Sequence, residues 1–152
     1  MSPSTVPLGS SGTLVTLEPV LVLADTSVVM GDLRFTHLRC ELRGDELFEY
    51  TQVRKGNRAI GCTFDVAYTG TDYDAGIFGE NLRLVMPSGD PRAPTRAPIG
   101  NVGRDQQVQG FRAVFVVPWP APGTYTLRLL YNDRYTGNAR NSKDITLTVP
   151  AP

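Results

Sequence analysis

The chain has 152 residues, 41% of them hydrophobic, and its 15 basic residues balance its 15 acidic ones. This composition predicts a single globular domain with a hydrophobic core rather than a disordered chain. A net charge of zero removes the general electrostatic attraction on which nucleic-acid binding depends, so we expect no nucleic-acid partner.

The N-terminal segment, MSPSTVPLGSSG, lacks both the basic start and the apolar stretch of a signal peptide. It predicts a protein that stays in the compartment where it is made, or one whose leader has been removed. We expect residues 1–12 to form an extended arm outside the domain. No apolar run of about 18 residues occurs, so we expect no membrane span.

The first predicted strand, TLVTLEPVLVLAD, is broken at Glu18-Pro19, because proline cannot donate to a β-ladder. The next two segments, LRFTHLRCEL and LFEYTQV, flank Gly44-Asp45 and predict a hairpin. The tripeptide Arg43-Gly44-Asp45 matches an integrin-binding motif. We interpret it as the turn of this hairpin, since Gly accepts positive φ and Asp bonds back to the backbone.

Alternation of apolar and polar residues dominates the rest of the chain and predicts strands with one buried face. The predicted buried rows are Ile60, Cys62, Phe64, Val66 and Tyr68; Leu82, Leu84 and Met86; Phe111, Ala113, Phe115 and Val117; Tyr125, Leu127, Leu129 and Tyr131; and Ile145, Leu147 and Val149. With the first half, they predict about eight strands within residues 13–149 and no confident helix. The expected fold is all-β: an antiparallel β-sandwich or a jelly-roll-like barrel.

Residues 87–106, PSGDPRAPTRAPIGNVGRDQ, contain four prolines and show no periodicity. Loops longer than about 12–15 residues are uncommon in compact domains and are usually functional or disordered. The prolines favour an extended segment that loses little entropy when it lies along a surface. We therefore expect a long surface loop here, and a short tail at residues 150–152.

Three stretches carry a family resemblance: CTFDVAYTGTD, NLRLVMPSGD and VFVVPWPAPGTYTLRLLYND. The first is a strand that ends in a polar turn, the second is closed by Ser-Gly-Asp, and in the third a Pro-Gly turn precedes a Tyr-x-Leu-x-Leu strand. Over roughly residues 59–149 the chain resembles immunoglobulin-like β-sandwich modules of bacterial and phage proteins. The resemblance implies an immunoglobulin-like fold, but such modules serve in adhesion, ligand binding, enzyme accessory domains and virion decoration.

Cys40 and Cys62 lie on different predicted strands, and two buried thiols or a disulfide would both fit. The single histidine, His37, has no second metal ligand nearby, so we expect a structural or surface role. It cannot activate Cys40, because strand residues three apart point to opposite faces. We find no catalytic pair, phosphate loop or zinc pattern, and we expect neither an enzyme nor a cofactor site.

Asp72, Asp74 and Glu80 are the only candidates for a metal site, as oxygen ligands for calcium. Their spacing departs from the EF-hand pattern, since Gly76 stands at the fifth position and Arg83 where the bidentate Glu belongs. We expect solvated carboxylates rather than a metal site.

Several segments are candidates for a protein interface. Trp119, between two prolines, would be either a core plug or an exposed anchor. The polar segment 131–144 would be a long hairpin, a protein contact, or a sugar platform with Tyr131 and Tyr135. The residues that we expect at an interface are Val6, Pro7, Leu8, Arg92, Arg96, Ile99, Arg104, Trp119 and Tyr135.

A sandwich with proline-rich extensions suits a protein that ties subunits together. We therefore expect a non-catalytic subunit of a multi-subunit assembly: a decoration (cement) protein that stabilises a phage capsid. Its partners would be capsid or other assembly proteins and further copies of itself, in the virion or in cytoplasmic assembly. The alternative is an extracytoplasmic immunoglobulin-like binding or adhesion module, in which Cys40 and Cys62 should be bonded, or a carbohydrate-binding accessory domain.

Overall fold

The computed structural model of the protein describes residues 5–8, 13–16, 20–44, 47–48, 51–132 and 139–151, with side chains for residues 20–44, 52–131 and 142–151. Within these ranges the chain forms antiparallel strands and one 3-10 helix, η2 (Gly79–Asn81). The all-β prediction is confirmed.

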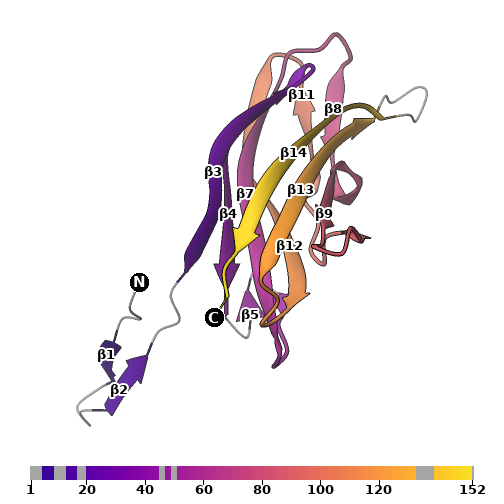
Figure 1. The fold of residues 1–152 in the computed structure, drawn as a ribbon. Coiled ribbons are helices and arrows are strands. Elements are labelled where there is room, and N and C mark those ends of the chain that lie inside the picture. The colour runs from indigo at the N-terminus through magenta and orange to yellow at the C-terminus, as the bar shows by residue number, and fades with distance from the viewer. Residues whose placement is uncertain are drawn as a thin grey trace.

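Two four-stranded sheets pack face to face in a sandwich (Figure 1). The first sheet has the order β12-β7-β4-β3, and the second has the order β10-β9-β13-β14. The strands of the first are β3 (Leu21–Met30), β4 (Leu33–Arg43), β7 (Asn57–Tyr68) and β12 (Gln106–Pro118). Those of the second are β9 (Leu82–Val85), β10 (Pro91–Arg92), β13 (Gly123–Asn132) and β14 (Ala139–Val149).

Six shorter strands form three separate antiparallel pairs outside these two sheets. They are β1 (Thr5–Leu8) with β2 (Thr13–Thr16), β5 (Leu47–Phe48) with β6 (Thr51–Gln52), and β8 (Asp74–Ile77) with β11 (Gly100–Gly103). The β8–β11 pair, called the ribbon below, joins segments that are far apart in the sequence.

Three local expectations differ from the structure. The segment 1–12, expected as an extended arm, contains β1, which pairs with β2. The hairpin expected around Gly44 does not form, because β4 pairs with β3 and β7 while β5 pairs with β6. Arg43 ends β4 and lies 3.6 Å from Glu41, and Asp45 of the tripeptide is outside the described residues.

The long loop expected at 87–106 is instead tied to the domain by backbone hydrogen bonds. It contains β10 and β11 and, between them, a bridge from Arg96 to Val114 of β12. The amide of Thr95 donates to the carbonyl of Val114 at 2.7 Å. The prolines interrupt these ladders without preventing them, because each ladder is only a few residues long.

The core lies between the sheets and contains the rows that alternation predicts. All five residues of the β7 row and all four of the β12 row are buried, and only Tyr131 and Ile145 among the predicted positions are half-buried. At the centre Phe64 contacts Phe35 and Phe111, with ring centroids 5.5 and 5.7 Å apart. Burial of this apolar surface is the main stabilising term of the fold.

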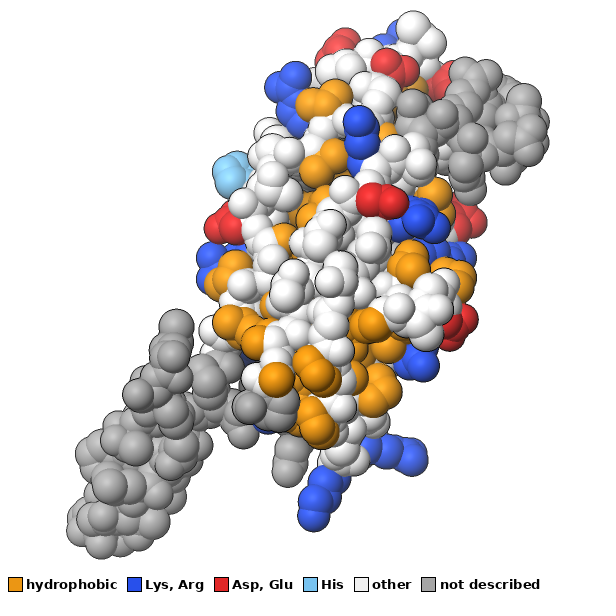
Figure 2. All heavy atoms as spheres, in the orientation of Figure 1, with side chains coloured by type: hydrophobic (Ala, Val, Ile, Leu, Met, Phe, Trp, Pro, Cys, Tyr) orange, Lys and Arg blue, Asp and Glu red, His pale blue; other side chains and the backbone are white. Residues whose placement is uncertain are grey.

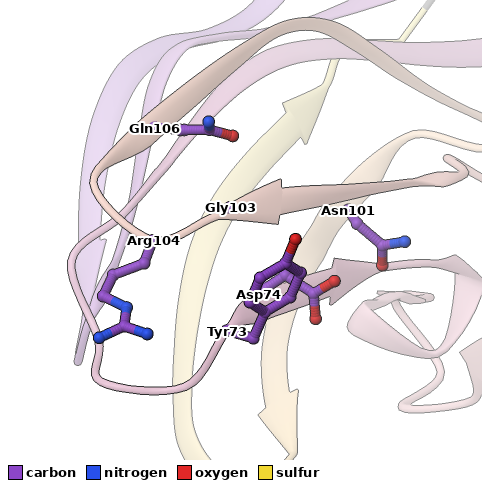
Figure 3. A pocket seen from close by; sticks show the side chains of 6 residues that line it. All are labelled: Tyr73, Asp74, Asn101, Gly103, Arg104 and Gln106. Atoms are coloured by element: carbon purple, nitrogen blue, oxygen red, sulfur yellow. The ribbon is translucent and has the colours of Figure 1, made fainter.

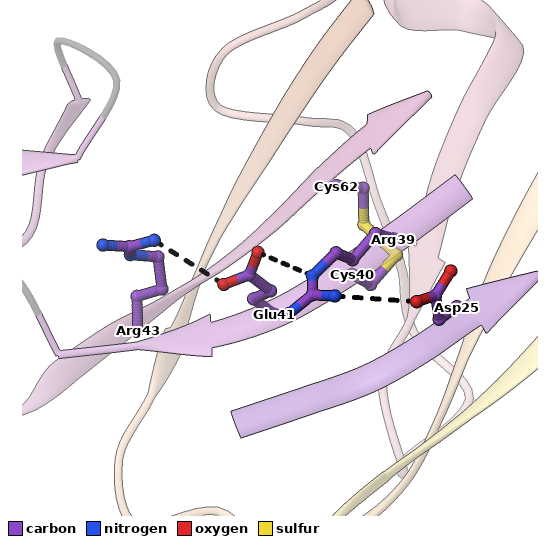
Figure 4. Close-up of polar contacts among 6 residues, drawn as sticks. All are labelled: Asp25, Arg39, Cys40, Glu41, Arg43 and Cys62. Atoms are coloured by element: carbon purple, nitrogen blue, oxygen red, sulfur yellow. Dashed lines mark hydrogen bonds and ion pairs between the residues drawn. A yellow bond between two sulfur atoms is a disulfide. The ribbon is translucent and has the colours of Figure 1, made fainter. Parts of the chain in front are cut away.

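Cys40 and Cys62 form a disulfide within this core. They are direct partners in the β4–β7 ladder, and both side chains face inward and are fully buried. Of the two states that the sequence left open, the structure therefore has the bonded one. Figure 4 shows the disulfide beneath β4.

The opposite face of β4 is charged. Arg39 lies 3.1 Å from Glu41 and 3.5 Å from Asp25, as Figure 4 shows. On the face seen in Figure 2, acidic and basic side chains of the described residues are interspersed. No broad region of a single sign covers that view, as the zero net charge would suggest.

Candidate functional site

The inner face of the ribbon fixes it to the sandwich. Ala75, Ile77 and Val102 are buried in the core, so their neighbours in sequence face outward. Gly100 lies so close to Phe111 that a Cβ there would be 2.7 Å from the ring. Glycine is therefore required at this position for the strand to approach the core.

Asn81 connects the end of the ribbon to the second sheet. It is the only buried polar or charged residue among those whose side chains are described. Its Oδ1 accepts a hydrogen bond from the Phe78 amide, and its Nδ2 donates to the Leu130 carbonyl, each at 2.8 Å. These bonds satisfy two backbone groups and link the segment after β8 to β13.

A hollow of about 350 Å³ opens on the outer side of the ribbon. It is lined by Tyr73, Asp74, Asn101, Gly103, Arg104 and Gln106. Figure 3 shows the side chains of Tyr73, Asp74 and Asn101 close together beside the two strands, with Arg104 on the following turn and Gln106 at the start of β12.

Two backbone hydrogen bonds hold the turn that carries Arg104. The Arg104 amide donates to the Tyr73 carbonyl at 3.1 Å, and the Asp105 amide donates to the Tyr68 carbonyl at 2.8 Å. Asp105 has a φ of 59°, a left-handed conformation that Asp tolerates better than most residues. The rim of the hollow is therefore built into the β8–β11 and β11–β12 connections.

Exposed apolar side chains are concentrated around this ribbon. Five large hydrophobic residues are exposed in the described part of the chain: Val22, Val29, Tyr73, Phe78 and Ile99. Three of the five border the ribbon, with 81% of Tyr73, 80% of Ile99 and 38% of Phe78 exposed. Exposed aromatic residues beside Arg and Asn are typical of recognition surfaces.

The predicted interface residues lie in different places. Ile99 and Arg104 lie at the two ends of β11. Arg92 is exposed on β10, 3.8 Å from Asp90, and Arg96 lies on the segment that bridges to β12. The structure therefore brings two of these four residues to the ribbon.

Trp119 lies at the end of the sandwich and is half-buried against the core. Its amide donates to the Gly56 carbonyl at 2.9 Å, and Arg58 Cζ lies 4.6 Å from its ring centroid. This environment suits the plug interpretation, and an interface role for Trp119 stays a prediction.

The other predicted interface positions fall outside what the structure describes. The side chains of Val6, Pro7 and Leu8 in β1 are not among the described ones, and Tyr135 lies outside the described residues.

The calcium candidates are not brought together. Asp74 lines the hollow, the Asp72 amide is bonded to the Tyr68 hydroxyl at 3.1 Å, and Glu80 lies in η2. Within the described ranges, no group of three or more acidic, His or Cys side chains could hold a metal ion.

His37 is exposed on β4 and lies 2.9 Å from Asp65 through Nδ1. It has a φ of 52° and lies where the β4–β7 register shifts between Thr36 and Arg39. Asp65 also accepts a hydrogen bond from the Gly110 amide at 3.0 Å, next to the irregularity in β12. The pair therefore connects two irregular strand segments, which is a structural role.

Tyr131 is half-buried near one end of the sandwich rather than presented as a flat platform. Burial raises its pKa to about 12, and the hydrogen bond to Tyr68 and the charges of Asp72 and Asp32 act in the same direction. Its hydroxyl is thus kept neutral and engaged within the fold.

Sequence reasoning missed Tyr73, Asn101 and Gln106. The available signal was the aromatic residue between two aspartates in TDYDAG, where only the carboxylates were considered. Nothing local connects this stretch with Asn101, because the two meet only through the β8–β11 ladder.

Comparisons with protein-family models, with curated proteins and with solved structures give no match. The resemblance to immunoglobulin-like modules therefore stays a prediction. None of the helices in the described part of the chain is long and apolar enough to cross a membrane.

Proposed function

We propose that this chain is a non-catalytic binding module that works in an oxidising, extracytoplasmic compartment. The observation that carries the proposal is the buried Cys40–Cys62 disulfide. Disulfides persist in secreted and periplasmic proteins, whereas cytosolic thiols are kept reduced. A bond between two inward-facing residues of central strands is structural, because neither sulfur is accessible for redox exchange.

The binding role is supported by the ribbon rather than by the fold, since sandwiches serve many functions. Tyr73 and Ile99 are about four-fifths exposed next to polar side chains, on a segment that the core holds in place. Such a surface is suited to recognition.

A second candidate is the capsid-decoration subunit expected from the sequence. It is favoured by the β1–β2 pair, which belongs to neither four-stranded sheet. A two-stranded hairpin is marginally stable in water by itself, so a neighbouring subunit would be a suitable partner for it.

The thiol state separates the two candidates. Protein from its native source is alkylated during lysis, denatured, and analysed by mass spectrometry. The extracytoplasmic module should show neither cysteine alkylated. Alkylation of both Cys40 and Cys62 would overturn the proposed compartment and favour cytoplasmic assembly.

The oligomeric state gives an independent test. Light scattering on the whole chain and on a variant without residues 1–11 should give the same monomeric mass for a binding module. An oligomer that the deletion dissociates, with the sandwich still folded by circular dichroism, would support the decoration subunit instead.

A further inference from the structure

The chemistry of the hollow on the ribbon indicates a class of ligand. Its lining combines one aromatic ring, Tyr73, with the carboxamides of Asn101 and Gln106. Each carboxamide offers both donors and an acceptor, so each can bond two neighbouring hydroxyl groups at once. An aromatic ring beside such groups can stack on the C–H face of a sugar ring while the polar groups bond its edge.

The charges in the hollow favour a neutral ligand. Asp74 and Arg104 contribute one charge of each sign, and no other ionisable group except the Tyr73 phenol lines it. A phosphate or carboxylate site would need an excess of positive charge, which this lining does not have. Hydroxyl groups, in contrast, can use both a carboxylate acceptor and a guanidinium donor.

The size of the hollow limits the ligand further. A volume of about 350 Å³ lies near the lower end of ligand sites, which span roughly 300–1,000 Å³. It is open on the outer side of the ribbon, so it suits one or two rings at the end of a longer chain.

The site is also preformed. Asn81 fixes the end of β8 to β13, the Arg104–Tyr73 backbone bond fixes the rim, and Gly103 allows the Gln106 side chain to lie directly over β11. Preorganisation of this kind lowers the cost of ordering side chains on binding.

We propose that the hollow binds a neutral carbohydrate, with Tyr73 stacking on a sugar ring and Asn101 and Gln106 bonding its hydroxyls. The inference rests on the proposed binding function and gives it a ligand class. It places the sugar on the ribbon, away from the Tyr131 and Tyr135 segment that the sequence suggested.

The test is an NMR titration of the ¹⁵N-labelled, oxidised full chain with maltose, cellobiose, lactose and N,N′-diacetylchitobiose, each to about 20 mM, since a site of this size should bind with a Kd on the order of 1 mM. We expect at least one of the four to cause saturable shifts in the amides of residues 73–76 and 101–106. Tyr73→Ala and Asn101→Ala should each raise that Kd by about tenfold. Val29→Ala and Thr146→Ala, exposed positions on β3 and β14, are the matched controls and should leave it unchanged.

Absence of saturable shifts with all four sugars would overturn the carbohydrate proposal. So would shifts that Tyr73→Ala does not weaken, or binding of a protein through the ribbon without any response to sugars. The thiol experiment keeps the two proposals apart. Oxidised cysteines without sugar binding would refute only the ligand class, and sugar binding with two free thiols would refute only the compartment.

Discussion

The β4–β7 ladder and the β8–β11 ribbon are both antiparallel strand pairs, yet their side chains are distributed in opposite ways. The ladder runs from Leu33 opposite Tyr68 to Arg43 opposite Ala59, and its inner face is continuous apolar core. The ribbon has four residues in each strand, and it buries Ala75, Ile77 and Val102 only.

This difference separates stability from recognition. A residue at the centre of the ladder touches core on every side, so its loss cannot be compensated. A residue on the outer face of the ribbon, such as Tyr73, contacts little besides solvent and leaves the fold unchanged when it is replaced. Functional side chains commonly occupy such connecting segments on a rigid scaffold, because they are free to change.

The strongest test of this comparison is Phe64→Ala. Phe64 lies between Phe35 and Phe111, so truncation leaves a cavity among aromatic rings and should cost about 3–5 kcal/mol in the free energy of unfolding. Tyr73→Ala, the matched aromatic truncation on the ribbon, should change it by no more than about 0.5 kcal/mol. Urea denaturation measures both, and equal losses would contradict the assignment of stability to the ladder.

Removal of the disulfide should have the next largest effect. Cys40 and Cys62 are separated by 22 residues, and closure of a loop of that length restricts the unfolded chain by about 3 kcal/mol. The double variant Cys40→Ala/Cys62→Ala should lower the free energy of unfolding by about this amount and be insensitive to reductant. The unmodified chain in reductant is the control. No difference between its oxidised and reduced forms would argue against a structural disulfide.

Asn81→Ala tests the junction between the two regions. It leaves the Phe78 amide and the Leu130 carbonyl without their partner, at a cost of about 1–3 kcal/mol. Hydrogen exchange should accelerate most in β8 and β11, and much less in β7. Asn101→Ala, on the exposed face of the ribbon, is the control. Uniform acceleration across both regions would show that the ribbon does not open independently of the sandwich.

The ladder was largely predictable from sequence and the ribbon was not. Side chains of a strand point to opposite faces in turn, so alternation identifies the buried row of a strand without knowledge of its neighbours. The rows that begin at Ile60 and Phe111 are buried throughout, as predicted. The half-buried state of Tyr131 and Ile145, near one end of the sandwich, reflects position along the strand, which alternation does not encode.

Pairing between remote segments leaves no such local signal. In Asp74–Ile77 and Gly100–Gly103, glycine occupies three positions, which weakens any apolar alternation. The register that places Asp74 opposite Gly103 is set by burial of Ile77 and Val102 in a core formed by other strands. The hollow exists only once this register is fixed, so the sequence indicated its acidic residue and missed its partners.

The smallest expected effect concerns Tyr131 and appears only at high pH. The fold keeps its proton until the pKa of about 12, whereas an unfolded tyrosine ionises near pH 10. Between about pH 10 and 12 the unfolded state therefore loses protons first, and stability falls as pH rises. Burial also raises the pKa of Tyr125, so replacing Tyr131 alone should reduce this dependence without abolishing it.

Tyr131→Phe should match the unmodified chain near neutral pH and lose less stability between pH 10 and 12, as measured by urea denaturation across that range. Tyr73→Phe removes a phenol from the exposed ribbon and is the matched control. An identical pH dependence in the chain and in Tyr131→Phe would show that this hydroxyl is not held by the fold. A reduced dependence would extend the comparison, because it would place a neutral, buried tyrosine within the sandwich and an accessible one, Tyr73, on the ribbon.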